Sequence, residues 1–288
     1  LDSCIIITKP TRNLEANKMS NIKTYSGKEL LDPANSALFE EIVLMISLAF
    51  HDDPSTKWIF DGCTPSEYAT LRPHYFRFLT KMALRVGGMV TVIIGDNPKS
   101  ATTETTTTTT QTQTDTQVPA ASKIRAAGVL IPSSSNEAFE STWNVICSGF
   151  LALPFTVGLR STLKISMGIG GPLRKMQARV LPEAEERHSY WHLLILATHP
   201  DSQGQGLGKK MLLEFQDVVG HAEEGKKNKG GLYLEAGSLG ARRLYARTGF
   251  VDRDTMAFGD CVRQGGDIIK QSDGRVTGGR MWAMTWNA

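Results

Sequence analysis

The chain has 288 residues, of which 41% are hydrophobic and 21% charged, and its formal net charge is +3 at pH 7. That length allows one large domain or two small ones, and the near-neutral charge argues against a nucleic-acid partner. The four cysteines form no CxxC pair, so we expect no disulfide scaffold and no metal site, but a reducing, cytoplasmic compartment. No apolar run reaches the roughly 18 residues that a membrane span needs, so no membrane partner is expected.

Residues 1–20 are polar and aperiodic, and we interpret them as an N-terminal tail before a single domain over residues 21–288. Apolar side chains then recur every three to four residues from Asn35 to Phe50, which predicts a helix. A second helix is predicted over residues 66–86. We expect it to be interrupted near Pro73, because proline lacks the backbone N–H that a helix interior uses.

A β-branched run at residues 89–94 and a second strand-like run at residues 124–131 predict strands that could pair as a hairpin with a very long loop. Between them, eleven of the sixteen residues from Thr102 to Gln117 are threonine, and the rest are Gln, Glu and Asp. Such a tract has no apolar surface to offset the entropy of ordering it. We therefore expect a disordered Thr-rich insertion at about residues 97–122.

Residues 137–186 are predicted to be mostly helical, with breaks at Pro154 and at residues 168–172. Their content of Leu, Phe, Val and Ile is typical of a long element that covers a binding pocket. The acceptor side of that pocket would come from this segment and the first two helices. Candidate lining residues are Phe50, Asp52, Asp53, Trp58 and Tyr75.

A glycine-rich turn follows the most apolar strand of the chain. Residues 190–198 form an almost continuous apolar run, typical of a strand that is covered on both faces. The sequence QGQGLGK at residues 203–209 comes next, and apolar residues at helical spacing follow it. Glycines allow close approach of the backbone, and the first N–H groups of a helix lack internal partners. The turn therefore predicts a phosphate-binding site.

The spacing of these residues excludes the two common nucleotide-binding motifs. A GxGxxG fingerprint from Gly204 or Gly206 would need glycine at positions 209 or 211, which are Lys209 and Met211. A Walker A loop would need glycine where Gln203 stands. The pattern that is present is Q-x-x-G-x-G.

That pattern resembles the pyrophosphate-binding signature of the GCN5-related N-acetyltransferase (GNAT) superfamily, with Gln203, Gly206 and Gly208 in the fixed positions. About forty residues downstream, a predicted strand at residues 232–236 and the sequence LYARTGF at residues 244–250 resemble the second conserved block of that superfamily. The pieces occur in family order, and the chain is similar to fungal members of the small-molecule type.

The resemblance implies an α/β (α+β) fold. In it, helices flank a mixed, mostly antiparallel sheet of six to seven strands with a splayed central strand pair. Acetyl-CoA would bind as co-substrate in the gap between those two strands. The residues implied in cofactor binding are Leu196, Ala197 and Thr198 on the strand, Gln203, Gly204, Gln205, Gly206, Leu207, Gly208 and Lys209 in the turn, and Ser238 where many members carry Asn.

The resemblance also implies direct transfer of an acetyl group to an amine. Tyr245 matches the family tyrosine that protonates the leaving thiolate. A base must first remove a proton from the amine, and both His192 and Glu235 are candidates. The acceptor would be a small-molecule primary amine, with a peptide amine as an alternative, and the protein a monomer or homodimer. O-acetylation, protein N-acetylation and a non-catalytic acyl-CoA-binding module remain alternatives.

Overall fold

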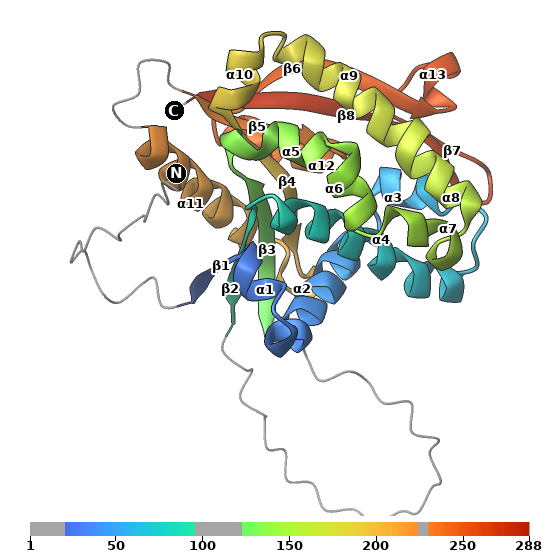
Figure 1. The fold of residues 1–288 in the computed structure, drawn as a ribbon. Coiled ribbons are helices and arrows are strands. Elements are labelled where there is room, and N and C mark those ends of the chain that lie inside the picture. The colour runs from blue at the N-terminus through green and yellow to red at the C-terminus, as the bar shows by residue number, and fades with distance from the viewer. Residues whose placement is uncertain (1–20, 96–122, 224–229, 288) are drawn as a thin grey trace, which may run out of the picture.

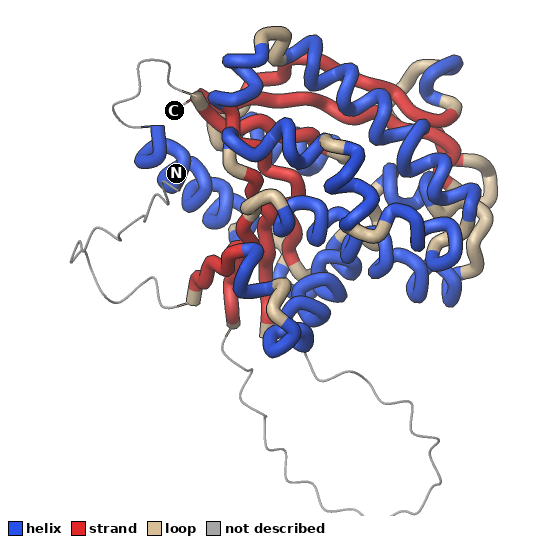
Figure 2. Tube along the Cα trace, viewed as in Figure 1, coloured by secondary structure: helices blue, strands red, loops and turns tan. Residues whose placement is uncertain are grey.

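The computed structural model describes residues 21–95, 123–223 and 230–287 (Figures 1 and 2). The N-terminal tail and the Thr-rich insertion predicted above lie outside the described residues. The strands are β1 (Ile22–Ser26), β2 (Met89–Ile94), β3 (Ile124–Ile131), β4 (Tyr190–Thr198), β5 (Gly231–Ala236), β6 (Val251–Gly259), β7 (Ile268–Lys270) and β8 (Val276–Asn287).

Helices precede, separate and follow these strands. They are α1 (Gly27–Leu30), α2 (Ser36–Ala49), α3 (Pro54–Ile59), α4 (Pro65–Arg85), α5 (Asn136–Glu140), α6 (Thr142–Cys147), α7 (Leu153–Thr156), α8 (Leu159–Leu163), α9 (Gly171–Val180), α10 (Ala184–Ser189), α11 (Leu207–Glu223), α12 (Leu239–Arg247) and α13 (Cys261–Gln264). A π-helix, η4 (Lys164–Gly170), joins α8 to α9, and a 3-10 turn, η3 (Phe150–Ala152), precedes α7. No helix among these residues is long and apolar enough to cross a membrane.

The described strands form one 8-stranded sheet in the order β1-β2-β3-β4-β5-β8-β6, with β7 paired to β8. All neighbouring pairs are antiparallel except β4 and β5, which run parallel at the centre. This confirms the expected fold class, a mixed and mostly antiparallel sheet flanked by helices. The short β7 brings the strand count one above the predicted upper limit.

The central parallel pair separates partway along its length. Pairing between β4 and β5 runs only from Tyr190 opposite Gly231 to Leu193 opposite Leu234. Beyond this point β4 continues to Thr198, while the end of β5 pairs with β8 alone. The two strands therefore form a fork, and its two arms carry unpaired inner edges.

A β-bulge in β4 lies where the fork opens. Val129 pairs with Ile195 and Leu130 pairs with Leu193, so Leu194 is the extra residue. One extra residue shifts the alternation of a strand, so side chains two residues apart across the bulge point to opposite faces. Leu193 packs into the cluster beneath α11, whereas Ile195 and Ala197 pack into the cluster beneath α2 and α4.

Helices cover both faces of the sheet (Figure 1). On one face, α11 and α12 contribute Phe215 and Tyr245 to a core with β4, β5 and β8. On the other face, α2 and α4 pack against β2, β3 and β4, and α9 packs against β5, β6 and β8. The acceptor-side helices and the phosphate-side helix therefore approach the fork from opposite faces.

The predicted break in the second helix is wrong, because α4 runs without interruption through Pro73. Proline removes the hydrogen bond to the carbonyl of the fourth residue before it, and that residue, Ala69, is solvent-exposed. Water can satisfy the freed carbonyl there. A capping box between Thr64 and Glu67 supplies two further hydrogen bonds at the helix start.

The expected break at residues 168–172 is also absent. The π-helix η4 carries the chain through Gly168 and Gly170 directly into α9, and Pro172 stands just after the change from π to α turns. Pro154 lies in the first turn of α7, after the chain has broken near Gly149, and proline needs no N–H partner there.

Candidate active site

A cavity of about 730 Å³ runs from the glycine-rich turn, through the fork, to the ends of α2 and α3. Residues 193–198 of β4 form one wall, and α12 forms the opposite wall. Of the predicted cofactor-binding residues, the lining includes Leu196, Ala197, Thr198, Gln203, Gly204, Gly206, Leu207, Gly208, Lys209 and Ser238. Gln205 is not among the lining residues, and its amide donates a hydrogen bond to the Asp201 carbonyl at 3.2 Å.

The turn has the backbone conformation and the free space that an anion needs. Gly204 and Gly206 have φ values of 77° and 75°, in the left-handed region that favours glycine. No atom lies within 4 Å of where a Cβ would stand at either position. At Gly208 a Cβ would lie 3.2 Å from Leu244 Cδ2, so this glycine lets α12 approach the start of α11.

Positive charge and a helix N-terminus face the same end of the cavity. The helix α11 begins at Leu207, and its dipole favours a negative group beside its first N–H groups. Lys209 lines the cavity from α11 and Arg247 lines it from α12. Sequence analysis missed Arg247, although its place two residues after Tyr245 puts it in the recognised block.

His192 and Glu235 meet at the fork. His192 Nε2 and Glu235 Oε2 are 2.9 Å apart, and the two side chains are only 8% and 10% exposed. His192 stands opposite Tyr233 in the parallel register, and Glu235 follows the last paired residue of β5. The two candidate bases therefore form one hydrogen-bonded pair.

Aromatic rings enclose this pair. The rings of Phe139 and Tyr233 contact the His192 imidazole edge-on, at centroid distances of 6.0 and 5.3 Å. The Tyr233 hydroxyl is buried without a hydrogen-bond partner among the described residues. Burial, followed by the charge of Glu235, raises the pKa of Tyr233 well above its ordinary value, so this phenol stays neutral.

A second cavity of about 330 Å³ opens on the other side of the pair. Its walls are mainly apolar side chains from α4, α6, η3 and η4, and His192 and Glu235 lie at one end. The two cavities share the lining residues Tyr75, Leu79, Ile169, Leu173, Leu194 and Glu235. Glu235 is therefore the one member of the pair that faces both spaces.

Glu140 adds a second carboxyl group to the smaller cavity. Desolvation raises its pKa, and the nearby charges of His192, Arg174 and Arg187 oppose that shift. Arg174 also lines the smaller cavity, from α9, so its apolar walls carry two carboxyl groups and one guanidinium. An apolar cavity with a few polar groups suits a small molecule with an apolar body.

Tyr245 lies in the wall of the larger cavity and is buried. Burial raises the pKa of its phenol, and the nearby carboxylates of Asp53 and Glu235 raise it further. The hydroxyl therefore stays protonated across the physiological pH range and can donate a proton.

Of the acceptor-side residues predicted from sequence, the larger cavity is lined by Phe50, Asp52, Asp53 and Tyr75. Trp58 lines neither cavity; its ring packs against Phe258 and beneath the ammonium of Lys164. Asp53 caps α3, accepting a hydrogen bond from Thr56 N at 3.0 Å. A Cβ at Gly237 would lie 2.7 Å from Asp53 Oδ2, which places this carboxyl beside the end of β5.

Asp53→Asn should change the pH dependence of stability. Burial raises the pKa of Asp53 above its ordinary value of 3.8, although hydrogen bonds from Ser55 and Thr56 oppose the shift. The folded state then holds the proton more tightly, so stability falls as pH rises from about 3.8 to the raised pKa. Asparagine also caps helices but does not titrate. The variant should therefore gain stability relative to the parent across this window, by about 1.4 kcal/mol per unit of pKa difference.

Urea unfolding at a series of pH values, starting below the ordinary carboxyl pKa, measures this difference. Asp32→Asn is the matched control, since Asp32 caps a short turn with its side chain at the surface. A stability difference for Asp53→Asn that stays constant with pH would contradict the expected proton linkage.

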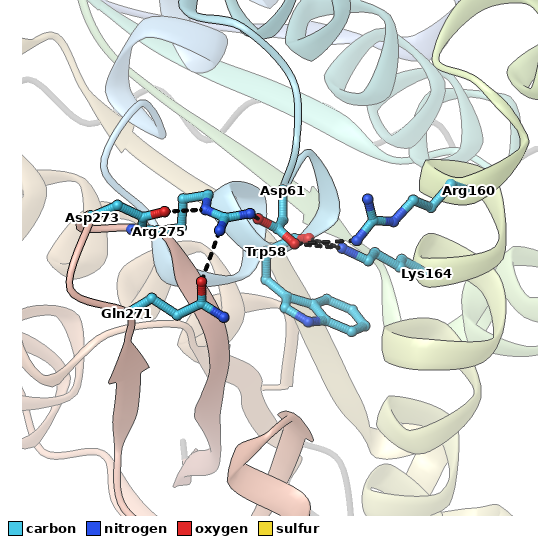
Figure 3. A network of polar contacts seen from close by, with 7 residues as sticks. All are labelled: Trp58, Asp61, Arg160, Lys164, Gln271, Asp273 and Arg275. Atoms are coloured by element: carbon cyan, nitrogen blue, oxygen red, sulfur yellow. Dashed lines mark hydrogen bonds and ion pairs between the residues drawn. The ribbon is translucent and has the colours of Figure 1, made fainter.

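An ion-pair network holds the segment above the smaller cavity in place (Figure 3). Asp61, after α3, accepts a hydrogen bond from Arg160 at 3.2 Å and lies 3.9 Å from Lys164 Nζ. Arg275, from the hairpin of β7 and β8, pairs with Asp61 and with Asp273. One carboxylate thus ties α8 and η4 to α3 and to the edge of the sheet.

The chain is similar to known proteins in part of its sequence and in its fold. Residues 176–252, which include His192, the glycine-rich turn, Glu235 and Tyr245, match the family model described as acetyltransferase (GNAT) domain. The structure of arylalkylamine N-acetyltransferase 2 from Aedes aegypti aligns with 93% of this chain and 99% of its own chain. The sequence identity is 11% and the TM-score is 0.51. The histone acetyltransferase HPA2 and related acetyltransferase from Corynebacterium glutamicum is 18% identical over 92% and 95%, with a TM-score of 0.42. No curated protein matches the chain.

The fold is that of the GNAT acetyltransferases. The match over residues 176–252 supports the GNAT superfamily for this chain and, with it, an acyltransferase enzyme. Enzymes of this class generally use acetyl-CoA as co-substrate.

Proposed function

We propose that this protein transfers the acetyl group of acetyl-CoA directly to a primary amine of a small molecule, as a single domain over residues 21–288. The observation that carries the proposal is the position of Glu235, which faces both the cavity beside the glycine-rich turn and the smaller cavity. A thioester in one space and an amine in the other would meet there. A non-catalytic acyl-CoA-binding module would need no such buried base.

The residues that would hold acetyl-CoA fit its chemistry. Gly204 and Gly206 leave open space for the pyrophosphate, and Lys209 and Arg247 supply positive charge. The inner edge of β4 at residues 194–198 has backbone groups that β5 does not use. An amide-containing pantetheine arm can pair with such an edge.

A cationic amine must lose two protons and the sulfur must gain one, so the reaction releases one proton to solvent. Glu235, held by His192, accepts the first proton, and the freed lone pair of the nitrogen attacks the thioester carbonyl carbon. The second proton leaves the nitrogen after the attack. The C–N bond forms and the C–S bond breaks. Tyr245 donates its proton to the departing thiolate, and the products are an N-acetyl amide and the free thiol of CoA.

Within the class of small amines, the smaller cavity favours a primary amine on an aromatic or alkyl body. Its apolar walls suit such a body, and Glu140 with Glu235 suits the cationic nitrogen. A polyamine would bury further cationic nitrogens against these apolar walls.

The described free cysteines Cys63, Cys147 and Cys261 support the proposed reducing, cytoplasmic compartment.

Calorimetric titration with acetyl-CoA, followed by detection of free thiol with a series of amines, tests the proposal. Each amine should be compared with the alcohol of the same carbon skeleton. Turnover of amines alone supports N-acetylation, whereas faster turnover of alcohols would replace it with O-acetylation. Binding of acetyl-CoA without turnover of any amine, peptide or alcohol would favour the non-catalytic module, and a folded protein that does not bind acetyl-CoA would refute the cofactor assignment.

Tyr245→Phe should lower kcat by about 100-fold, because it removes the proton that stabilises the departing thiolate. The affinity for acetyl-CoA should stay within about twofold, since the ring still fills the same space. Steady-state kinetics and calorimetry measure the two effects separately. Tyr190→Phe is the matched control, because its hydroxyl bonds to Asn287 at the far end of β4. Unchanged kcat in Tyr245→Phe would rule out the assigned acid.

A further inference from the structure

The segment above the smaller cavity exposes a regular row of large apolar side chains. They recur at every fourth residue and are defined here as the outer stripe: Leu151, Phe155, Leu159, Leu163 and Met167. Their exposed fractions are 65%, 90%, 64%, 48% and 73%. None of them lines either of the two cavities.

The spacing explains why three of them share a face, whereas Gly158, with a φ of 84°, separates Leu151 and Phe155 from that helix. Leu159, Leu163 and Met167 stand on successive turns of the continuous helix formed by α8 and η4, and Phe155 lies on α7, which packs against α8. A second row, offset by two residues, is buried: Leu153, Val157, Ser161, Ile165 and Ile169. The core thus needs only one side of the segment. A second, solvent-exposed apolar side indicates a surface that interacts with a membrane or with another protein.

The segment that carries the stripe has a net positive charge. Residues 141–182 contain five basic residues and no Asp or Glu, and Asp61 and Asp254 pair with three of the five. The other two, Arg174 and Lys175, are exposed on α9, the continuation of the same helix, and Arg174 also lines the smaller cavity. Arg160 and Lys164 flank the stripe, and Asp61 holds them (Figure 3).

We infer that the outer stripe docks on an anionic lipid bilayer, with its apolar side chains in the headgroup region and Arg174 and Lys175 facing the lipid phosphates. Exposed Leu, Phe and Met beside Lys and Arg are typical of helices that lie in the membrane interface. Basic residues near an anionic leaflet strengthen such binding. The proposed cytoplasmic location gives access to that leaflet.

The same charges disfavour a second copy of this chain as the occupant. A twofold contact through the outer stripe would bring together two segments whose five basic residues outnumber Asp61 and Asp254, the carboxylates that pair with three of them. A fluid lipid surface needs no shape complementarity to a single row of side chains, whereas a protein partner does. The inference rests on this surface and on the proposed cytoplasmic location, and it revises the expectation from sequence that there is no membrane partner. It is independent of the transferase proposal.

Flotation of the full chain with lipid vesicles tests this surface. We expect binding to phosphatidylcholine vesicles that contain roughly 30% phosphatidylserine, and much weaker binding to phosphatidylcholine alone. The double variant Phe155→Ser/Leu159→Ser should lower the partition coefficient by at least about tenfold. Arg174→Glu/Lys175→Glu should lower it on anionic vesicles only.

Leu44→Ser and Leu213→Ser are matched controls, since both leucines are about half exposed, at 50% and 49%, on α2 and α11. Binding of acetyl-CoA and the thermal midpoint show whether each variant is folded. Absence of vesicle binding in the folded parent, or equal loss in the controls, would overturn the inference. So would a concentration-dependent dimer that Phe155→Ser/Leu159→Ser dissociates, because a second copy would then cover the stripe.

Discussion

Glu235→Gln should lower kcat by about two to three orders of magnitude, while the affinity for acetyl-CoA stays within about twofold. Glutamine keeps the size of the side chain and can still contact His192 at the fork. It cannot accept the proton that the amine must lose. Because Glu235 faces both cavities, the loss should appear in the chemical step with every amine tested.

His192→Gln should lower kcat by a smaller factor than Glu235→Gln, because His192 lines only the smaller cavity and acts through Glu235. The kcat of the double variant should be no more than about twofold below that of Glu235→Gln, since the effects of substitutions in residues that act as a unit are not additive. Rate constants and pH profiles of the parent, the two single variants and the double variant give a full double-mutant cycle. A double variant whose loss equals the product of the two single losses would show two independent groups.

Glu140→Gln is the matched control in the same cavity. Glu140 can attract a cationic amine, but it faces only the smaller cavity. Its replacement should raise KM for the amine by less than about tenfold and leave kcat unchanged. If Glu140→Gln lost kcat and Glu235→Gln did not, the base would have to be reassigned to Glu140.

The phosphate end of the site could be predicted from sequence because its signal is local. A buried strand, three closely spaced glycines and an amphipathic helix lie within about forty residues, and each part imposes its own pattern. The structure places Gly204, Gly206 and Gly208 in the lining of one cavity. Gln205 differs because its side chain turns back to Asp201, a choice of rotamer that the pattern does not specify.

The contact between His192 and Glu235 could not be predicted, although each residue was a candidate. They are 43 residues apart, and the parallel register of β4 and β5 brings them together. A one-residue shift in that register would move one of them to the opposite face. The sequence carried no signal for the bulge at Leu194, which determines how β4 leaves the fork.

The helical segment before β4 shows a different limit. Glycine and proline at residues 168–172 predicted a break, yet the wide turns of η4 pass through the glycines and Pro172 opens α9. Local propensity predicts that the helix ends at these residues. Packing of Ile165, Ile169 and Met176 against the core stabilises the continuous helix instead. Tertiary contacts can override propensity, which amounts to about 1 kcal/mol for a helical glycine.

Gly206→Glu should abolish measurable binding of acetyl-CoA, with an increase in Kd of more than about 100-fold. The φ of 75° at Gly206 strains any side chain, and the free space around its Cβ position is where the pyrophosphate is proposed to lie. A carboxylate there would repel the anion that α11, Lys209 and Arg247 attract. Calorimetric titration of the folded variant measures the loss.

Two further variants separate charge from strain and from general damage. Gly206→Ala carries the same backbone strain without the carboxylate, and should raise Kd by less than about tenfold. Gly220→Glu places the same side chain in open space on α11, two turns or more from the cavity, and should leave Kd unchanged. If Gly206→Ala weakened binding as strongly as Gly206→Glu, the backbone conformation of the turn would matter more than its charge. If Gly206→Glu bound acetyl-CoA as tightly as the parent, the cofactor would have to lie elsewhere, and the fork would lose its assigned thioester.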